Sequence, residues 1–174
     1  MKFLLYVKPW ILFLIFIIGI ILGSDNSYGL FICFACWIIL TGWIYHIGNT
    51  MHNLMPVNLK PDIKYFKFSC ILIPSSIMLC NIYYLYIAQL IPQKNIIELA
   101  GSIAILIYMI WTWIYIIMFA ARMLESAIEG QLVNRSDALK GCFCLLFFPI
   151  GVWYIQPAVQ RVLNKYNSTN ETNY

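Results

Sequence analysis

Four long apolar runs separated by polar stretches constrain the fold of this chain more than any motif does. They cover roughly residues 3–23, 28–47, 68–90 and 99–121. A helix needs about 20 apolar residues to cross the ~30 Å hydrocarbon core of a bilayer, so each run is long enough for one crossing. Charged residues are only 10% of the chain, against about 25% in soluble domains. The sequence therefore predicts an all-α polytopic membrane protein, a four-transmembrane-helix bundle forming a single transmembrane domain over residues 1–166.

The first run has a competing interpretation as a secretory signal peptide, because a basic start at Lys2 precedes its apolar middle. Ile21, Leu22 and Gly23 at its end match the small-residue cleavage pattern poorly. A retained membrane span is therefore the favoured interpretation.

The basic residues predict an orientation. Cytoplasmic loops of membrane proteins carry an excess of Lys and Arg. With a cytoplasmic N-terminus, the four crossings leave only Lys94 outside. The other ten of the eleven basic residues are then inside: Lys2, Lys8, Lys60, Lys64, Lys67, Arg122, Arg135, Lys140, Arg161 and Lys165. We therefore expect a multi-pass protein of the cell membrane with both termini in the cytoplasm.

A fifth apolar stretch, residues 141–155, is too short for a comfortable crossing at about 22 Å as a helix. Pro149 and Gly151 interrupt it, and basic residues flank it on both sides at Lys140 and Arg161. This pattern favours a short re-entrant or interfacial helical hairpin that enters and leaves on the cytoplasmic side. A fifth full span is the alternative.

Trp153 and Tyr154 are expected to anchor this hairpin at headgroup depth, where amphipathic rings are favoured. Pro149 and Gly151 are expected to supply its bend. The polar end of the chain, residues 167–174, is predicted to be a disordered tail.

The segment between the fourth run and the hairpin carries helix-boundary signals. We expect the fourth helix to continue to about Glu129 and to end at Gly130, a residue common just after helix ends. Ser136 is a candidate N-cap for the next helix.

The cysteines invite a redox or metal interpretation. Cys33 and Cys36 have the spacing of a redox motif, but they lie within an apolar run and lack the usual βαβ context. Buried cysteine commonly serves as a small apolar residue, and all six lie in apolar runs: Cys33, Cys36, Cys70, Cys80, Cys142 and Cys144.

A soft metal site can be imagined around His46 and His52, with Met51, Met55 and Asp62 nearby. Two side chains six residues apart on a helix point to different faces, which disfavours joint ligation. We expect no metal, no cofactor and no catalytic residues.

Two polar side chains lie near the middle of predicted spans, Asn81 in the third and Thr112 in the fourth. They could contact a ligand or line a pore, but an interhelical polar contact between them is the favoured interpretation. No charged residue lies near mid-depth, which argues against a proton-coupled transporter.

At the inner end of the fourth run, Arg122 and Glu125 are three residues apart and can pair on one helix face, with Glu129 close by. The net charge of +4 is attributed to loops facing anionic lipid, and no nucleic-acid partner is expected.

Three stretches carry a resemblance to a known family. They are Lys8-Pro9-Trp10, Tyr65-Phe66-Lys67 and Pro149-Ile150-Gly151-Val152-Trp153-Tyr154-Ile155-Gln156-Pro157. The chain resembles small bacterial four-span integral membrane proteins with a C-terminal Pro-Ile-Gly-x-Trp-x-Ile-Gln-Pro motif. The resemblance implies the four-span fold and a location in the bacterial cytoplasmic membrane, but it transfers no activity. Ala158 stands where that pattern usually has a basic residue.

The sequence thus favours a non-enzymatic helper or interaction subunit whose partners are the lipid bilayer and other membrane proteins or itself. The alternative is a small channel or transporter, as an oligomer, with the hairpin as its pore element. A lipid-modifying enzyme is the third interpretation; it would need His46 to meet Glu125 or Glu129 in space.

Overall fold

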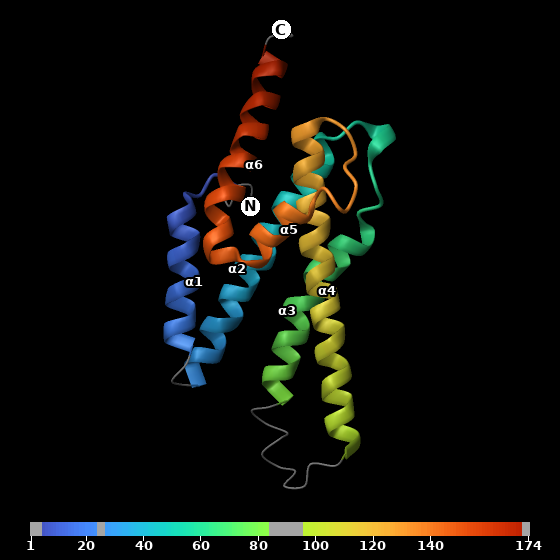
Figure 1. Ribbon diagram of the computed structural model, residues 1–174. Coiled ribbons are helices and arrows are strands. Elements are labelled where there is room, and N and C mark those ends of the chain that lie inside the picture. The colour runs from blue at the N-terminus through green and yellow to red at the C-terminus, as the bar shows by residue number, and fades with distance from the viewer. Residues whose placement is uncertain (1–4, 24–26, 84–95, 172–174) are drawn as a thin grey trace.

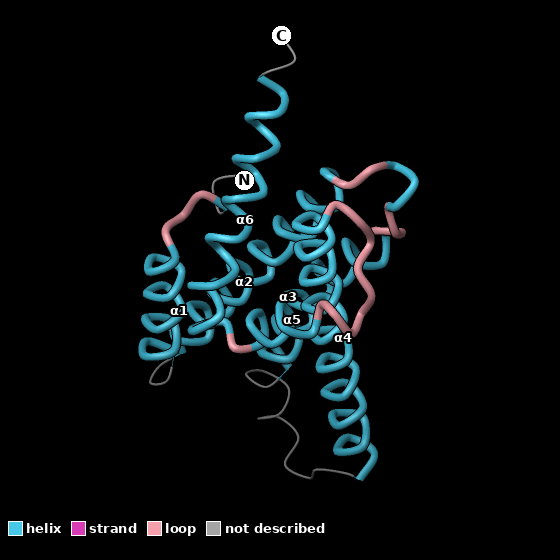
Figure 2. Tube along the Cα trace, turned by 45° about the horizontal axis from the view of Figure 1, so that its top comes forward, coloured by secondary structure: helices cyan, strands magenta, loops and turns pink. Residues whose placement is uncertain are grey.

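The computed structural model describes residues 5–23, 27–83 and 96–171. Over these ranges the chain is all-α, with six α-helices and no strand (Figures 1 and 2). The elements are α1 (Pro9–Gly23), α2 (Ser27–Leu54), the short 3-10 helix η2 (Val57–Leu59), α3 (Lys64–Ile82), α4 (Ile96–Glu129), α5 (Leu139–Leu146) and α6 (Phe148–Glu171).

Each of the four apolar runs supplies the body of one of the helices α1 to α4. α2 lies at the centre and packs against α1, α3 and α4, while α5 and α6 pack against α4 and α6 also packs against α1. The start of α1, the connection from α2 to α3 and the end of α6 lie toward one end of the molecule (Figure 1).

Of the described helices, α4 alone is long and apolar enough to cross a bilayer by length and composition. Its segment Ala100–Glu129 has 30 residues and a mean hydropathy of 2.2 in its most apolar window. At 1.5 Å per residue it extends about 45 Å, which exceeds the ~30 Å thickness of a bilayer's hydrocarbon core. The apolar part of α1, Pro9–Gly19, is shorter.

Aromatic side chains form the core where α2, α3 and α4 meet. Phe66 of α3 is fully buried and stacks on Phe119 of α4, with ring centroids 4.4 Å apart. It also lies parallel to Tyr45 of α2. Gly48 permits this approach, because a Cβ there would be 2.5 Å from the Phe66 ring.

Gly130 ends α4 as the sequence predicted. Its φ of +74° is a left-handed conformation that glycine adopts without steric cost. The proposed Ser136 cap is wrong: α5 begins at Leu139, its N-cap residue is Ala138, and no side chain caps it. The Ser136 hydroxyl instead donates to the Asp137 carboxylate at 3.2 Å.

The C-terminal segment is a pair of helices joined by a sharp turn, but the turn is not at Pro149 or Gly151. It lies at Phe147, whose φ of −90° and ψ of 53° break the helical path between α5 and α6. Pro149 occupies the first turn of α6, where its missing N–H has no helical partner to lose. Gly151 faces α5, and a Cβ there would overlap the carbonyl oxygen of Cys144.

α6 is longer than the apolar stretch that it contains. Pro157, which follows that stretch in the sequence, lies inside the helix. The helix continues to Glu171 through part of the segment predicted to be a disordered tail, residues 167–174. Residues 172–174 lie outside the described ranges.

Candidate functional site

The most completely bonded polar side chain of the described core is Gln156, in the middle of α6. It is fully buried. Its Nε2 donates to the carbonyl oxygens of Leu5 at 2.6 Å and Val7 at 2.9 Å. Its Oε1 accepts a hydrogen bond from Nε1 of Trp43 at 3.0 Å. We call Leu5, Val7, Trp43 and Gln156 the Gln156 cluster; it joins α6 to α2 and to the segment before α1.

Gln156 belongs to the C-terminal motif, but the sequence alone predicted no role for it. The signal that could have identified it is a single polar amide placed between the apolar residues Ile155 and Pro157. A buried amide needs partners for both its donor and its acceptor. The three bonds meet that need, so the cluster has a structural role.

Thr112 is fully buried, but its hydroxyl donates to the carbonyl oxygen of Tyr108 at 2.8 Å, one turn earlier in α4. The side chain of Asn81 lies outside the described residues. The contact between the two therefore stays a prediction.

Arg122 and Ser126 of α4 hold the loop that follows the helix. Arg122 donates from Nε to the carbonyl oxygen of Val133 at 2.7 Å, and the Val133 N–H donates to Oγ of Ser126 at 3.1 Å. Glu125, the predicted partner of Arg122, lies beside α5, where a Cβ on Gly141 would be 3.2 Å from its Oε1.

A surface groove of about 530 Å³ separates the end of α4 from α6. We call it the α4–α6 groove. It combines apolar, aromatic and charged side chains: Glu125, Ala127, Ile128, Trp153, Tyr154, Pro157, Ala158, Arg161, Val162 and Lys165. Trp153 and Tyr154, the predicted interface anchors, both line it and are about half exposed. The side chain of Pro149 is not among those described, and Gly151 is buried against α5.

Charges are concentrated around this groove. Arg161 and Lys165 are exposed, and Nζ of Lys140 lies 4.9 Å from the ring centroid of Tyr154, a cation–π contact. Partial burial raises the pKa of Glu125, an effect that the nearby Lys140 ammonium opposes and Glu129 reinforces. Glu125 is the one carboxylate in the lining.

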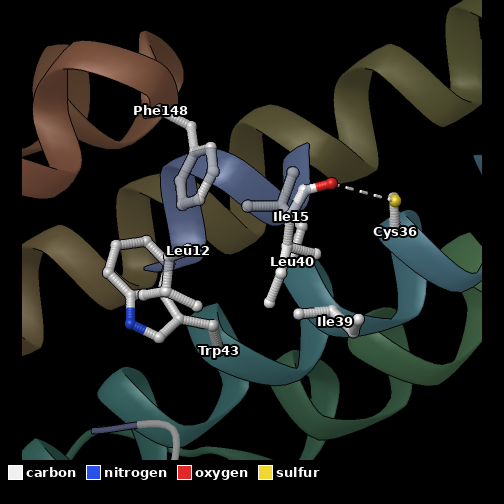
Figure 3. Close-up of a pocket in the computed structure, with 7 residues that line it drawn as sticks. All are labelled: Leu12, Ile15, Cys36, Ile39, Leu40, Trp43 and Phe148. Carbon is white, nitrogen blue, oxygen red and sulfur yellow. Dashed lines mark hydrogen bonds between the residues drawn. The ribbon is translucent and has the colours of Figure 1, made fainter. Parts of the chain in front are cut away.

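A second, much smaller recess lies between α1, α2 and the start of α6 (Figure 3). Its lining is almost entirely apolar: Leu12, Ile15, Cys36, Ile39, Leu40, Trp43 and Phe148. Its volume of about 10 Å³ is close to that of one water molecule. The Cys36 thiol donates to the carbonyl oxygen of Ile15 at 3.6 Å (Figure 3). Cys36 thus bonds α2 to α1, and the side chain of Cys33 lies outside the described residues.

The two histidines have separate surroundings. His52 is buried and its Nε2 lies 2.9 Å from the carbonyl oxygen of Pro61, which requires Nε2 to carry the proton. His46 is half-buried beside the Tyr45 ring. Within the described ranges, no group of three or more His, Cys, Asp and Glu side chains could hold a metal ion.

Comparisons with protein-family models, curated proteins and solved structures gave no match to this chain. Any function must therefore be argued from its own residues. Two features are available for that argument: the exposed apolar surface of α4 and the α4–α6 groove.

Proposed function

We propose that this chain is a multi-pass protein of the bacterial cytoplasmic membrane that acts as a non-enzymatic helper or interaction subunit. The observation that carries the proposal is the exposure of α4. Only 28% of its most apolar window is buried, whereas an apolar helix in the core of a soluble protein is buried on most sides. Lipid or another protein is the natural environment for such a surface.

The exposed part of α4 is continuous. Large apolar side chains are exposed around the helix over about three turns: Ile103, Ile105, Leu106, Ile107, Tyr108, Ile110, Trp111 and Ile114. Soluble monomers rarely expose apolar patches larger than a few hundred Å². A membrane surrounding α4 removes this conflict, because lipid tails solvate these side chains.

The four-span arrangement is part of the proposal. α1, α2 and α3 accompany α4 in the bundle (Figure 1). The positive-inside bias supports a cytoplasmic location for the end of the molecule that holds the start of α1, the α2–α3 connection and the end of α6. On this arrangement α5 and α6 form a hairpin that enters the membrane from the cytoplasmic side.

The buried polar groups support a structural use of the bundle interior. Gln156, Thr112 and Ser126 are all buried, and each is hydrogen-bonded within the chain. The bond between Gln156 and Trp43 joins α6 to α2, as polar side chains in membrane bundles often do. The α4 belt, residues 103–114, is an exposed apolar surface that fits an interaction role.

Photocrosslinking tests the interaction role. We expect benzophenone side chains placed at Ile107 or Trp111 to crosslink to a membrane protein or to a second copy, because both positions are more than 60% exposed on α4. Val57, 82% exposed in η2, is the control position. Products would be separated by mass and identified by mass spectrometry. Crosslinks to lipid alone at Ile107 and Trp111, or the same protein product at Val57, would refute the interaction role.

The orientation is tested by labelling single cysteines in a cysteine-free variant with a membrane-impermeant maleimide. We expect Gln93→Cys to react in intact spheroplasts, and Val57→Cys and Asn164→Cys only after lysis. This expectation is based on the positive-inside rule, because the proposed orientation puts ten of the eleven basic residues on the cytoplasmic side. Reaction of Asn164→Cys in intact spheroplasts would instead establish a fifth crossing.

A further inference from the structure

We propose that the α4–α6 groove binds the headgroup of an anionic phospholipid, while the tip of the α5–α6 hairpin contacts its acyl chains. The inference rests on the proposed membrane location. It goes beyond that location, because it assigns a chemical class of ligand to one site.

The tip of the hairpin is apolar and exposed. Phe147, at the turn, is 61% exposed, and Ile150, in the first turn of α6, is 78% exposed. Phe143 and Leu146 of α5 are exposed beside them. Side chains of this kind are stabilised by hydrocarbon, so the tip is suited to the acyl layer.

Polarity then changes stepwise along α6. Trp153 and Tyr154 follow the apolar tip, and Arg161 and Lys165 follow them. Trp153, Pro157, Arg161 and Lys165 are each four residues apart, so they form one row along the face of α6 that lines the groove. From Trp153 to Lys165 that face rises about 18 Å. Apolar tip, aromatic belt and cationic end match the acyl, interfacial and headgroup layers in order.

The charges favour an anionic headgroup. Lys140, which approaches Tyr154 from α5, is also close enough to Glu125 to act on its ionisation. Arg161 and Lys165 are two exposed cations along the wall of the groove, against the single carboxylate of Glu125 in the lining. A phosphate group accepts hydrogen bonds from such side chains, and Arg binds it through its planar fork.

A phospholipid fits these features better than an acidic peptide does. The groove holds apolar residues from both helices, including Ile128 of α4 and Val162 of α6. The exposed tip continues on the same hairpin. An amphiphile with a charged head and long apolar tails satisfies the groove and the tip together.

The experiment uses the full chain in nanodiscs of phosphatidylcholine with phosphatidylglycerol, followed by transfer to a neutral detergent. Native mass spectrometry then counts the phosphatidylglycerol retained relative to phosphatidylcholine. The variant is Arg161→Gln with Lys165→Gln. The matched control is Lys64→Gln with Lys67→Gln, two exposed cations at the start of α3. The groove variant removes the charge-assisted hydrogen bonds that two cations make to one phosphate, so we expect it to lose retention roughly tenfold or more. The control cations lie outside the groove, so we expect that variant to stay near wild type.

Equal losses in the two variants would mean diffuse attraction to basic surface and would overturn the site. Unchanged retention in the groove variant would overturn it as well. Inorganic phosphate added at millimolar concentration should not displace the lipid. Full displacement would identify a free-phosphate site instead. Membrane fractionation of wild type and both variants separates these results from failure of the membrane proposal, which would appear as wild-type protein outside the membrane fraction.

Discussion

Replacing Gln156 with leucine should destabilise the fold by about 3 kcal/mol or more. The substitution removes three hydrogen bonds and leaves the carbonyl oxygens of Leu5 and Val7 and the indole N–H of Trp43 without their partner. Each buried group left unpaired costs about 1–3 kcal/mol. Leucine has a similar volume, so little of the effect should come from lost packing. Thermal unfolding in detergent, followed by tryptophan fluorescence, measures the change.

The matched control is Gln160→Leu, one turn further along α6, where the side chain is only half-buried. It should change stability by less than about 0.5 kcal/mol, as surface substitutions commonly do. Trp43→Phe removes the indole donor together with part of the buried ring. Combined with Gln156→Leu, it should show a smaller loss than the sum of the two single losses, because both remove the same bond. Additive losses would show that the Trp43–Gln156 bond contributes nothing to stability.

The Gln156 cluster shows why the sequence predicted the helices better than their contacts. An apolar run of about 20 residues predicts a helix through length and composition, which are local properties. The helices α1 to α4 follow those runs. The partners of Gln156 at Leu5 and Val7 are 151 and 149 residues away along the chain. No periodicity encodes a contact at that separation.

Thr112 illustrates a different limit. Its mid-span position suggested a contact with another helix, but a threonine hydroxyl always has the carbonyl oxygen of its own preceding turn within reach. In α4 it donates to Tyr108. The local bond satisfies the hydroxyl donor without a second helix, so mid-span depth alone does not establish an interhelical bond, and the contact with Asn81 stays a prediction.

The hairpin was predicted, but its turn was misplaced for an identifiable reason. Pro149 was predicted to bend the chain, because proline disrupts the interior of a helix. In the first turn of a helix, however, proline is favoured and marks the start of the helix. Pro149 occupies that position in α6, and the chain bends at Phe147. Gly151 was also treated as a bend. Its α-helical position and its contact with Cys144 assign it to packing.

Even the smallest enlargement of Gly151 should therefore disrupt the hairpin. In Gly151→Ala the new Cβ would overlap the carbonyl oxygen of Cys144 and lie 2.7 Å from the Cys144 Cα. These are backbone atoms of α5, so no flexible side chain can turn aside. Relief requires α5 and α6 to separate, which also strains the bonds that Gln156 makes five residues later. Overpacking typically costs about 1–3 kcal/mol, and we expect a loss at or above the upper end.

Gly101→Ala is the matched control, since Gly101 also lies within a helix and a Cβ there meets no atom within 4 Å. Alanine is favoured over glycine in a helix by about 1 kcal/mol, so this variant should be neutral or slightly stabilised. Both substitutions make the same chemical change, and the difference between their melting temperatures therefore isolates the α5–α6 contact. An engineered disulfide between α5 and α6 should recover little stability in Gly151→Ala. It would hold the two helices together, and the alanine Cβ would still overlap the Cys144 carbonyl oxygen. If Gly151→Ala and Gly101→Ala instead had the same melting temperature, α5 and α6 would have to pack less closely than the structure shows. The geometry of the hairpin that forms one side of the α4–α6 groove would then need revision.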